Sequence, residues 1–179
     1  MCRQRGDTII EVLLAVTVFS MLAIGTMVIM NRGAAIAERS LEITLVRQQI
    51  DGQAEMLRYV HARYSAGDAH YTDMWTNKLP KSVGGSVEAL GAGSCPATQP
   101  SQSFALYPSG SNKIAKTTEF YTAETYAKLD SNRARGIWVQ LVKAQGSHAY
   151  DAYIQACWDG AGGQVQTTGT IVRLYDPKA

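Results

Sequence analysis

Charge is almost absent from the first part of this chain. Between Glu11 and Arg32 the sequence contains no Asp, Glu, Lys or Arg. Aromatic residues are scarce in the same region, because Phe19 is the only one that precedes Tyr59. Proline does not occur before Pro80. These absences exclude an ordinary globular start with alternating polar and apolar faces, and they favour a long uninterrupted apolar helix.

The whole chain has 179 residues, of which 46% are hydrophobic and 18% charged, and its formal net charge is +2. A normal apolar content with low charge argues against disorder of the whole chain. A charge of this size makes no strong positive field, so binding of nucleic acid through bulk basicity is not expected. The contrast between an uncharged start and a mixed remainder favours a membrane-type N-terminus joined to a globular part.

The apolar run extends from Val12 to Met30, and Ile9 and Ile10 lengthen it at its start. At ~1.5 Å per residue such a helix spans roughly 30 Å, the thickness of the hydrocarbon core of a bilayer. A buried core helix is the alternative. Arg3 and Arg5 precede the run and favour a cytoplasmic N-terminus with the rest of the chain outside.

Glu11 distinguishes this segment from a standard secretory signal. A carboxylate in a membrane helix costs on the order of 2.5–3.5 kcal/mol at the bilayer centre and less near the interface. Gly6 precedes the apolar run, and no Ala-x-Ala cleavage site follows Met30. Either Glu11 reaches the headgroups by itself or it has a partner.

The stretch from Gly6 through Asp7, Thr8 and Glu11 into the apolar run resembles the processing site of type IV prepilins and pseudopilins. The resemblance implies a leader over 1–6, cleavage after Gly6, and an assembly helix over 7–30. Thr8 then takes the second mature position and Glu11 the fifth. Asp7 departs from the family, which commonly has Phe or Met first, and this leaves N-methylation of Asp7 open.

The same resemblance implies a structural role, as a minor pilin or pseudopilin of a pilus or a type II secretion-like system. The partners would be other pilin subunits, a prepilin peptidase, membrane lipid before assembly, and the inner-membrane assembly machinery. Glu11 would pair with the new amine of Asp7 on a neighbouring subunit. The chain would cross the cytoplasmic membrane once and later join an extracellular filament.

The residues from 31 to 66 continue as an amphipathic helix. Apolar residues recur every seven positions, at Ile36, Ile43, Ile50, Leu57 and Tyr64. Val46 and Val60 occupy intermediate positions on the same side of the helix. Arg39 and Gln53 interrupt this stripe, so packing on a sheet is favoured over a coiled coil.

The residues from 67 to 179 predict a loop-rich region with an antiparallel sheet. The segment 67–93 reads as an irregular connector in which Tyr71 and Trp75 are packing anchors. Strands are expected at 136–143, 149–158 and 167–175, joined as a meander, with 103–107 at an edge and a short helix at 119–129. A long helix on a small antiparallel sheet is an α+β roll, and the pilin resemblance implies the same architecture.

Three cysteines occur, Cys2, Cys95 and Cys157. Cleavage after Gly6 would remove Cys2, and the remaining pair would then form a Cys95–Cys157 disulfide outside the cytoplasm. Two separate reduced cysteines are the alternative.

No enzyme constellation, metal site or cofactor site is predicted. His61, His70 and His148 lack the spacing of metal ligands, and the glycine-rich turn at 159–163 has too few carboxylates for calcium. Two small basic spots, at 78–81 and 133–135, are expected to be solvated loops, so nucleic acid is an unlikely partner. The rival to a pilin subunit is a signal-anchored membrane protein with an extracytoplasmic binding domain.

Overall fold

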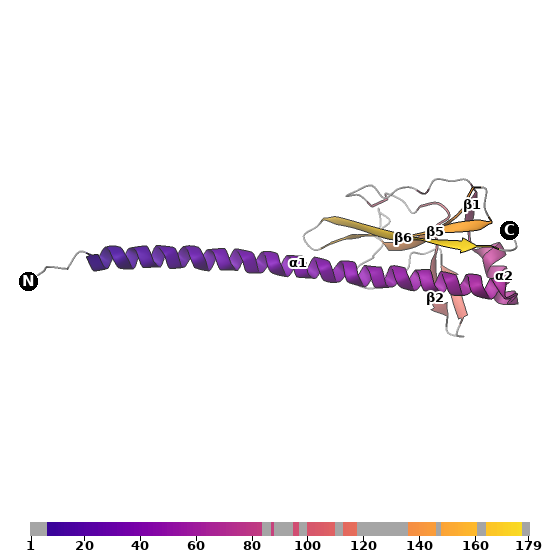
Figure 1. The fold of residues 1–179 in the computed structure, drawn as a ribbon, viewed down its shortest axis with the longest axis horizontal. Coiled ribbons are helices and arrows are strands. Elements are labelled where there is room, and N and C mark those ends of the chain that lie inside the picture. Colours follow the sequence, from indigo (N-terminus) through magenta and orange to yellow (C-terminus); the bar gives the residue numbers. More distant parts are fainter. Residues whose placement is uncertain are drawn as a thin grey trace, which may run out of the picture. The chain divides into compact units, whose positions relative to one another are not determined.

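The computed structural model of the chain describes residues 7–83, 87, 95–96, 100–109, 113–117, 136–145, 148–160 and 164–176. Contacts within the chain divide it into two units, Met1–Ser40 and Leu41–Ala179. The first unit holds the start of helix α1, and the second holds the rest of that helix together with the strands (Figure 1). The fold class is α+β, as the sequence predicts.

Helix α1 (Asp7–Ser65) covers both segments in which the sequence predicts a helix. Its end is set by Gly67, which has a φ of 84° that glycine adopts without steric cost. The N–H of Gly67 donates to the carbonyl of Tyr64 at 2.9 Å, and the N–H of Asp68 donates to that of Arg63 at 3.1 Å. These two bonds form a Schellman motif, which satisfies carbonyls that the helix end would otherwise leave open.

The expected irregular connector is wrong for its first part. Residues 69–78 form α2 (Ala69–Asp73) and the π-helix η1 (Met74–Lys78). Asp68 starts α2, because its Oδ1 accepts from the N–H of His70 at 3.0 Å and from that of Tyr71 at 3.4 Å. Tyr71 and Trp75 are buried, which confirms both as packing anchors. A local cap and two buried rings thus outweigh a composition typical of a loop.

The predicted antiparallel meander is confirmed. Strands β4 (Gly136–Lys143), β5 (Ala149–Asp159) and β6 (Val165–Tyr175) pair in sequence, with Val139 opposite Ile154 and Ile154 opposite Thr170. A fourth strand, β1 (Lys81–Val83), runs parallel to β4 on its other side. The sequence missed β1 because a strand this short, directly after Pro80, carries no periodic signal.

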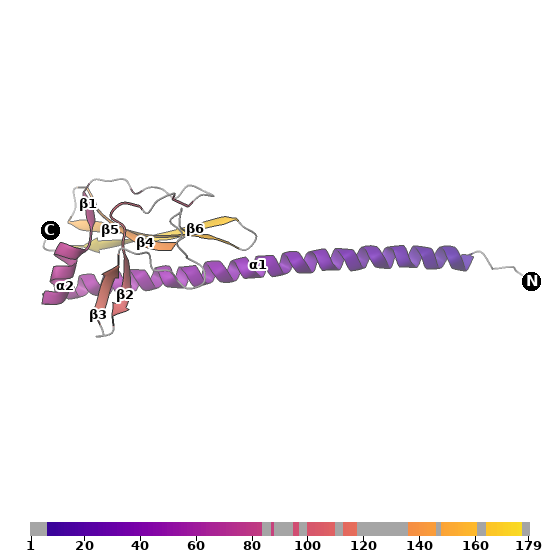
Figure 2. The same cartoon turned by 180° about the vertical axis from the view of Figure 1, so that it is seen from behind.

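The prediction that 103–107 forms an edge of this sheet is wrong. Strand β2 (Ala105–Ser109) pairs with β3 (Lys113–Thr117) in a separate two-stranded sheet. Among the described residues, Phe104 alone bridges to the larger sheet, through two backbone hydrogen bonds with Val139 of 3.0 and 2.7 Å. In both views the β2–β3 hairpin projects past α1 on the side opposite the larger sheet (Figure 2). The short helix expected at 119–129 lies outside the described residues.

The core of the second unit lies between α1 and the inner face of the larger sheet. The helix contributes a buried stripe, and β4 and β5 contribute alternate residues, so the predicted packing of helix on sheet is confirmed. The main members are Val46, Ile50, Leu57, Val60, Tyr64, Ile137, Val139, Leu141, Ile154 and Trp158. Burying each large apolar side chain contributes about 1.5–3 kcal/mol relative to exposure. Ile36 is the exception within the predicted stripe, since it belongs to the first unit and is 70% exposed.

Gln53 is buried within this stripe, where the sequence suggests only an interruption. Its Nε2 donates to the carbonyl of Leu106 at 2.8 Å, and its Oε1 accepts from the N–H of Leu106 at 2.9 Å. The amide therefore pairs with β2 as a neighbouring strand would. Because Gln53 satisfies both backbone groups of Leu106, this buried residue needs no partner in the larger sheet.

Replacing Gln53 by Leu should lower the free energy of unfolding by about 2 kcal/mol, because both backbone groups of Leu106 would lose their partner. Urea unfolding of the detergent-solubilised chain, followed by tryptophan fluorescence, measures this loss. Gln48→Leu on the exposed face of the same helix is the matched control and should change stability by less than about 0.5 kcal/mol. An equal effect of the two substitutions would contradict the role given to Gln53.

Candidate functional site

The residues predicted for processing and assembly lie at the start of the chain. Gly6 lies outside the described residues. Helix α1 begins at Asp7, so Asp7 and Thr8 belong to its first turn and Glu11 follows one turn later. Glu11 is exposed and makes no hydrogen bond or ion pair with any residue that the structure describes. A carboxylate near a helix N-terminus is favoured by the helix dipole.

The apolar part of α1 presents its side chains outward. All described side chains from Ile9 to Leu41 are exposed. Within α1 an 18-residue window has a mean hydropathy of 2.5, and none of that window is buried. A core helix of a soluble domain would be mostly buried, so this alternative does not fit. The described chain therefore contains one helix that is long and apolar enough to cross a membrane.

The hydroxyl groups within the apolar run are bonded to the helix itself. Thr17 donates to the carbonyl of Leu14 at 2.8 Å, Ser20 to that of Val16 at 2.7 Å, and Thr26 to that of Ala23 at 2.9 Å. Unpaired polar groups cost several kcal/mol in hydrocarbon. These three hydroxyl groups have acceptors within the helix, so their presence does not prevent the run from lying in an apolar environment.

Cys95 and Cys157 form a disulfide, with their Cα atoms 5.6 Å apart. The sulfur atoms lie in a small second cluster with Trp138 and Val165. Trp138 alternates along β4 with the core residues Ile137 and Val139, so this cluster lies on the sheet face opposite α1. The bridge ties Cys95 to β5, which is an interior strand of the larger sheet.

Removing the disulfide should destabilise the second unit by roughly 4 kcal/mol in the chain-entropy model, because the bridge closes a long loop. The comparison is urea unfolding of the wild type and of Cys95→Ala/Cys157→Ala. Thiol labelling of the unreduced chain should modify neither residue, and labelling after reduction should modify both. Full labelling before reduction would overturn the pairing.

A cluster around Asp176 joins the ends of several elements. Asp176 is 3% exposed, and it accepts from the hydroxyl of Tyr64 at 3.2 Å and from Nε1 of Trp75 at 3.3 Å. Its N–H donates to the carbonyl of His148 at 2.8 Å. The Lys81 ammonium lies 4.7 Å from the ring centre of Trp75. No sequence pattern indicates this cluster, because its members are far apart along the chain.

Burial shapes the ionisation of this cluster. It raises the pKa of Tyr64 and Tyr150, and the Asp176 carboxylate raises the pKa of both further. Burial lowers the pKa of Lys81, against the opposing effect of Asp176. The pKa of His61 is lowered from 6.5 by burial, an effect that Lys81 reinforces and Asp176 opposes. The ring of His61 packs edge-on against Trp75, with 4.8 Å between ring centres.

Acidification should therefore destabilise the second unit through His61. The unfolded chain takes up a proton near pH 6.5, whereas folded His61 does so only at lower pH. The contribution of neutral His61 to the free energy of unfolding is thus complete above pH 6.5. It falls as the pH drops below 6.5, until the pH passes the pKa of His61 in the folded chain. His61→Gln should flatten this fall in urea-unfolding curves at pH 5–7. His148→Gln, at an exposed histidine, should leave it in place.

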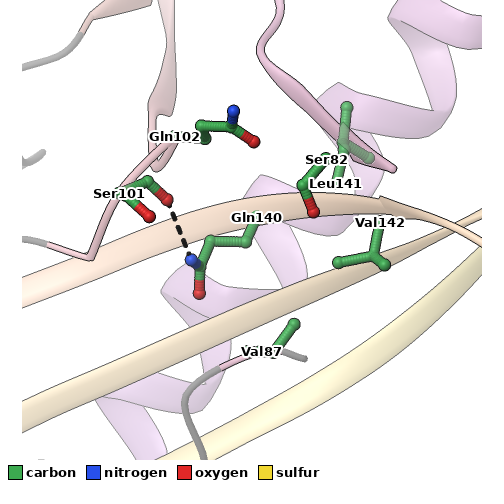
Figure 3. A pocket seen from close by; sticks show the side chains of 7 residues that line it. All are labelled: Ser82, Val87, Ser101, Gln102, Gln140, Leu141 and Val142. Atoms are coloured by element: carbon green, nitrogen blue, oxygen red, sulfur yellow. Dashed lines mark hydrogen bonds between the residues drawn. The ribbon is translucent and has the colours of Figure 1, made fainter. Parts of the chain in front are cut away.

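A small polar pocket lies between the outer sheet face and the segment that precedes β2. Its volume is about 260 Å³, and it is lined by Ser82, Val87, Ser101, Gln102, Gln140, Leu141 and Val142 (Figure 3). Nε2 of Gln140 donates to the carbonyl of Ser101 at 3.1 Å. Gln102 has a φ of 58°, which is unusual for a residue other than glycine. None of the lining residues that the structure describes has a charged side chain, and the volume is below the ~300–1,000 Å³ of typical ligand pockets.

The described residues offer little for other chemistry. No group of three or more His, Cys, Asp or Glu side chains that could hold a metal ion occurs among them. In the first of the two basic spots, Lys78 is paired with Asp73 at 2.9 Å and Lys81 is partly buried. The second spot, at 133–135, lies outside the described residues.

Comparison of the chain with protein-family models, with curated proteins and with solved structures gave no match. Function has to be inferred from the residues and contacts of this chain.

Proposed function

We propose that this chain is a structural subunit of a type IV pilus-like filament, as a minor pilin or a pseudopilin. It is inserted in the cytoplasmic membrane with its N-terminus inside, cut after Gly6, and polymerised through the first part of α1. The observation that carries the proposal is an exposed apolar helix that begins at Asp7, directly after Gly6, and carries Glu11 one turn later. This helix continues into a compact α+β unit.

The hydrophobicity of the first part of α1 supports two roles for this segment, as a membrane anchor and as a contact surface between subunits. Exposed side chains such as Leu13, Phe19 and Ile24 cannot remain in water at this density. Lipid is one apolar environment, and the packed helices of neighbouring subunits are another. The same helix therefore serves as an anchor before assembly and as a contact surface after it.

The charges support cleavage of the leader. Removal of residues 1–6 takes away Arg3 and Arg5 and no acid, which leaves as many basic as acidic residues and a formally neutral chain. The leader arginines hold the N-terminus in the cytoplasm until the cut. The cut also creates a positive amine at Asp7, and Glu11 of a neighbouring subunit can pair with it so that neither charge is buried alone.

The disulfide supports an extracytoplasmic location for the second unit. Disulfides persist in oxidising compartments, and Cys95–Cys157 lies in this unit. Cys2, the third cysteine, leaves with the leader. The role of the subunit is assembly and display, and no reaction is assigned to it.

Mass spectrometry of the mature N-terminus tests the proposal directly. In cells that contain a prepilin peptidase, the chain should begin at Asp7, and Gly6→Val should block the cut because the family's cleavage chiefly requires this glycine. A wild-type chain that keeps Met1 in such cells would falsify the proposal and favour the signal-anchored binding protein.

Substitution of Glu11 tests the assembly role. Glu11→Ala should leave membrane insertion intact and reduce recovery in sheared filaments by about tenfold, because the neighbouring amine would lose its partner. Glu38→Ala is the matched control, since Glu38 is exposed on the same helix outside the apolar run, and it should be recovered normally. Equal recovery of both variants would remove Glu11 from the assembly contact.

A further inference from the structure

The charges at the start of the mature helix do not balance. The new amine supplies one positive charge, whereas Asp7 and Glu11 supply two carboxylates within the first turns of α1. With an uncharged residue in the first position, amine and glutamate would cancel. Because Asp7 stands there, one negative charge remains after the amine has been neutralised. An apolar helix assembly that encloses this end needs a further cation.

Arg32 is the next charged residue along the helix after Glu11. It is exposed and makes no hydrogen bond or ion pair with any residue that the structure describes. Arg39, the next cation, differs because it takes part in an interaction within the chain. Glu11 and Arg32 are thus opposite charges at the two ends of one uncharged helical span.

Helix geometry relates the two positions. At ~1.5 Å per residue they lie about 31 Å apart along the axis, and at 3.6 residues per turn they are about 60° apart around it. The axial distance matches the ~30 Å hydrocarbon thickness of a bilayer. A subunit in the membrane therefore holds Glu11 at one interface and Arg32 at the other, where both can reach the headgroups.

We propose that Glu11 of one subunit pairs with Arg32 of a second copy of this chain, so that the α1 helices of these two subunits are staggered by about 31 Å. This inference rests on the proposed function and adds a second partner for Glu11 beside the amine, which a different neighbour contributes. The second copy is the occupant because the chain carries both members of the pair, Glu11 and Arg32.

The stagger follows from extraction out of the membrane. A subunit that moves outward by the length of its apolar span brings its Glu11 level with Arg32 of a subunit still in the bilayer. The two charges meet only at this displacement, since no other charged side chain lies between them on either helix. Arg–carboxylate pairs can form two parallel hydrogen bonds, and a carboxylate has lone pairs for the amine as well. Surrounding apolar side chains limit screening of the pair.

Cysteine cross-linking in assembling cells tests the stagger while both charges stay in place. Ala15→Cys and Ile36→Cys, which have the same spacing in the sequence as Glu11 and Arg32, should give an oxidised dimer that contains one copy of each when expressed on two differently tagged copies. Ala15→Cys with Ala23→Cys, a partner in the middle of the span, is the matched control and should give at least about tenfold less mixed dimer, because disulfides require Cα atoms within roughly 7 Å.

Substitution of Arg32 tests the pairing while Glu11 keeps the amine. Arg32→Glu should reduce recovery in filaments by about tenfold, whereas Arg32→Lys, which keeps the positive charge, should be recovered normally. Arg47→Glu, the same change at an exposed arginine outside the apolar run, is the matched control and should also be recovered normally.

The outcomes separate this inference from the proposed function. If the wild type begins at Asp7 and enters filaments, but the Ala15–Ile36 cross-link is absent or Arg32→Glu is recovered as well as Arg32→Lys, the stagger is wrong and the filament subunit stands. If the wild type keeps Met1 and never enters filaments, the proposed function and this inference both fall.

Discussion

The incompatibility of the first part of α1 with water is the constraint on which the other features depend. From Ile9 to Met30 the helix presents apolar side chains on all sides. The described residues of the first unit all belong to this helix, so no contact among them covers such a surface. The helix requires lipid or other helices, and its charges are confined to its two ends. Any role for this protein must place the apolar run in one of those environments, and an assembling subunit places it in both.

The second part of α1 meets a different demand within the same element. Its stripe from Val46 to Tyr64 packs against the sheet of its own chain in the core of the second unit. Two buried polar side chains of that unit have specific partners. Gln53 pairs with the backbone of Leu106, and Asp176 accepts from Tyr64 and Trp75. These contacts fix where a hairpin and a strand end meet the helix, which apolar packing alone does not specify.

Periodic features could be predicted from the sequence, and pairwise contacts could not. The helix follows from the uncharged apolar run and the seven-residue repeat, and strands β4, β5 and β6 follow from strand-forming residues between turn signals. The Cys95–Cys157 pair follows from the count of cysteines once Cys2 is assigned to the leader. The positions of β1 and the β2–β3 hairpin depend on partners distant in sequence, such as Gln53 for Leu106. The Asp176 cluster has the same origin. In the candidate site, the structure gives the place of Glu11 in α1 and its exposure, whereas its partner in an assembly remains a prediction.

The local hydrogen bonds of Thr17, Ser20 and Thr26 have a consequence for the kinetics of transfer. Each hydroxyl keeps its acceptor whether the helix is surrounded by acyl chains, detergent or protein, because that acceptor belongs to the helix. Moving the segment between these surroundings breaks none of these bonds. The activation barrier to this movement then depends on the exchange of side-chain contacts and on the charges at the two ends of the segment. The hydrogen bonds within the helix do not contribute to it.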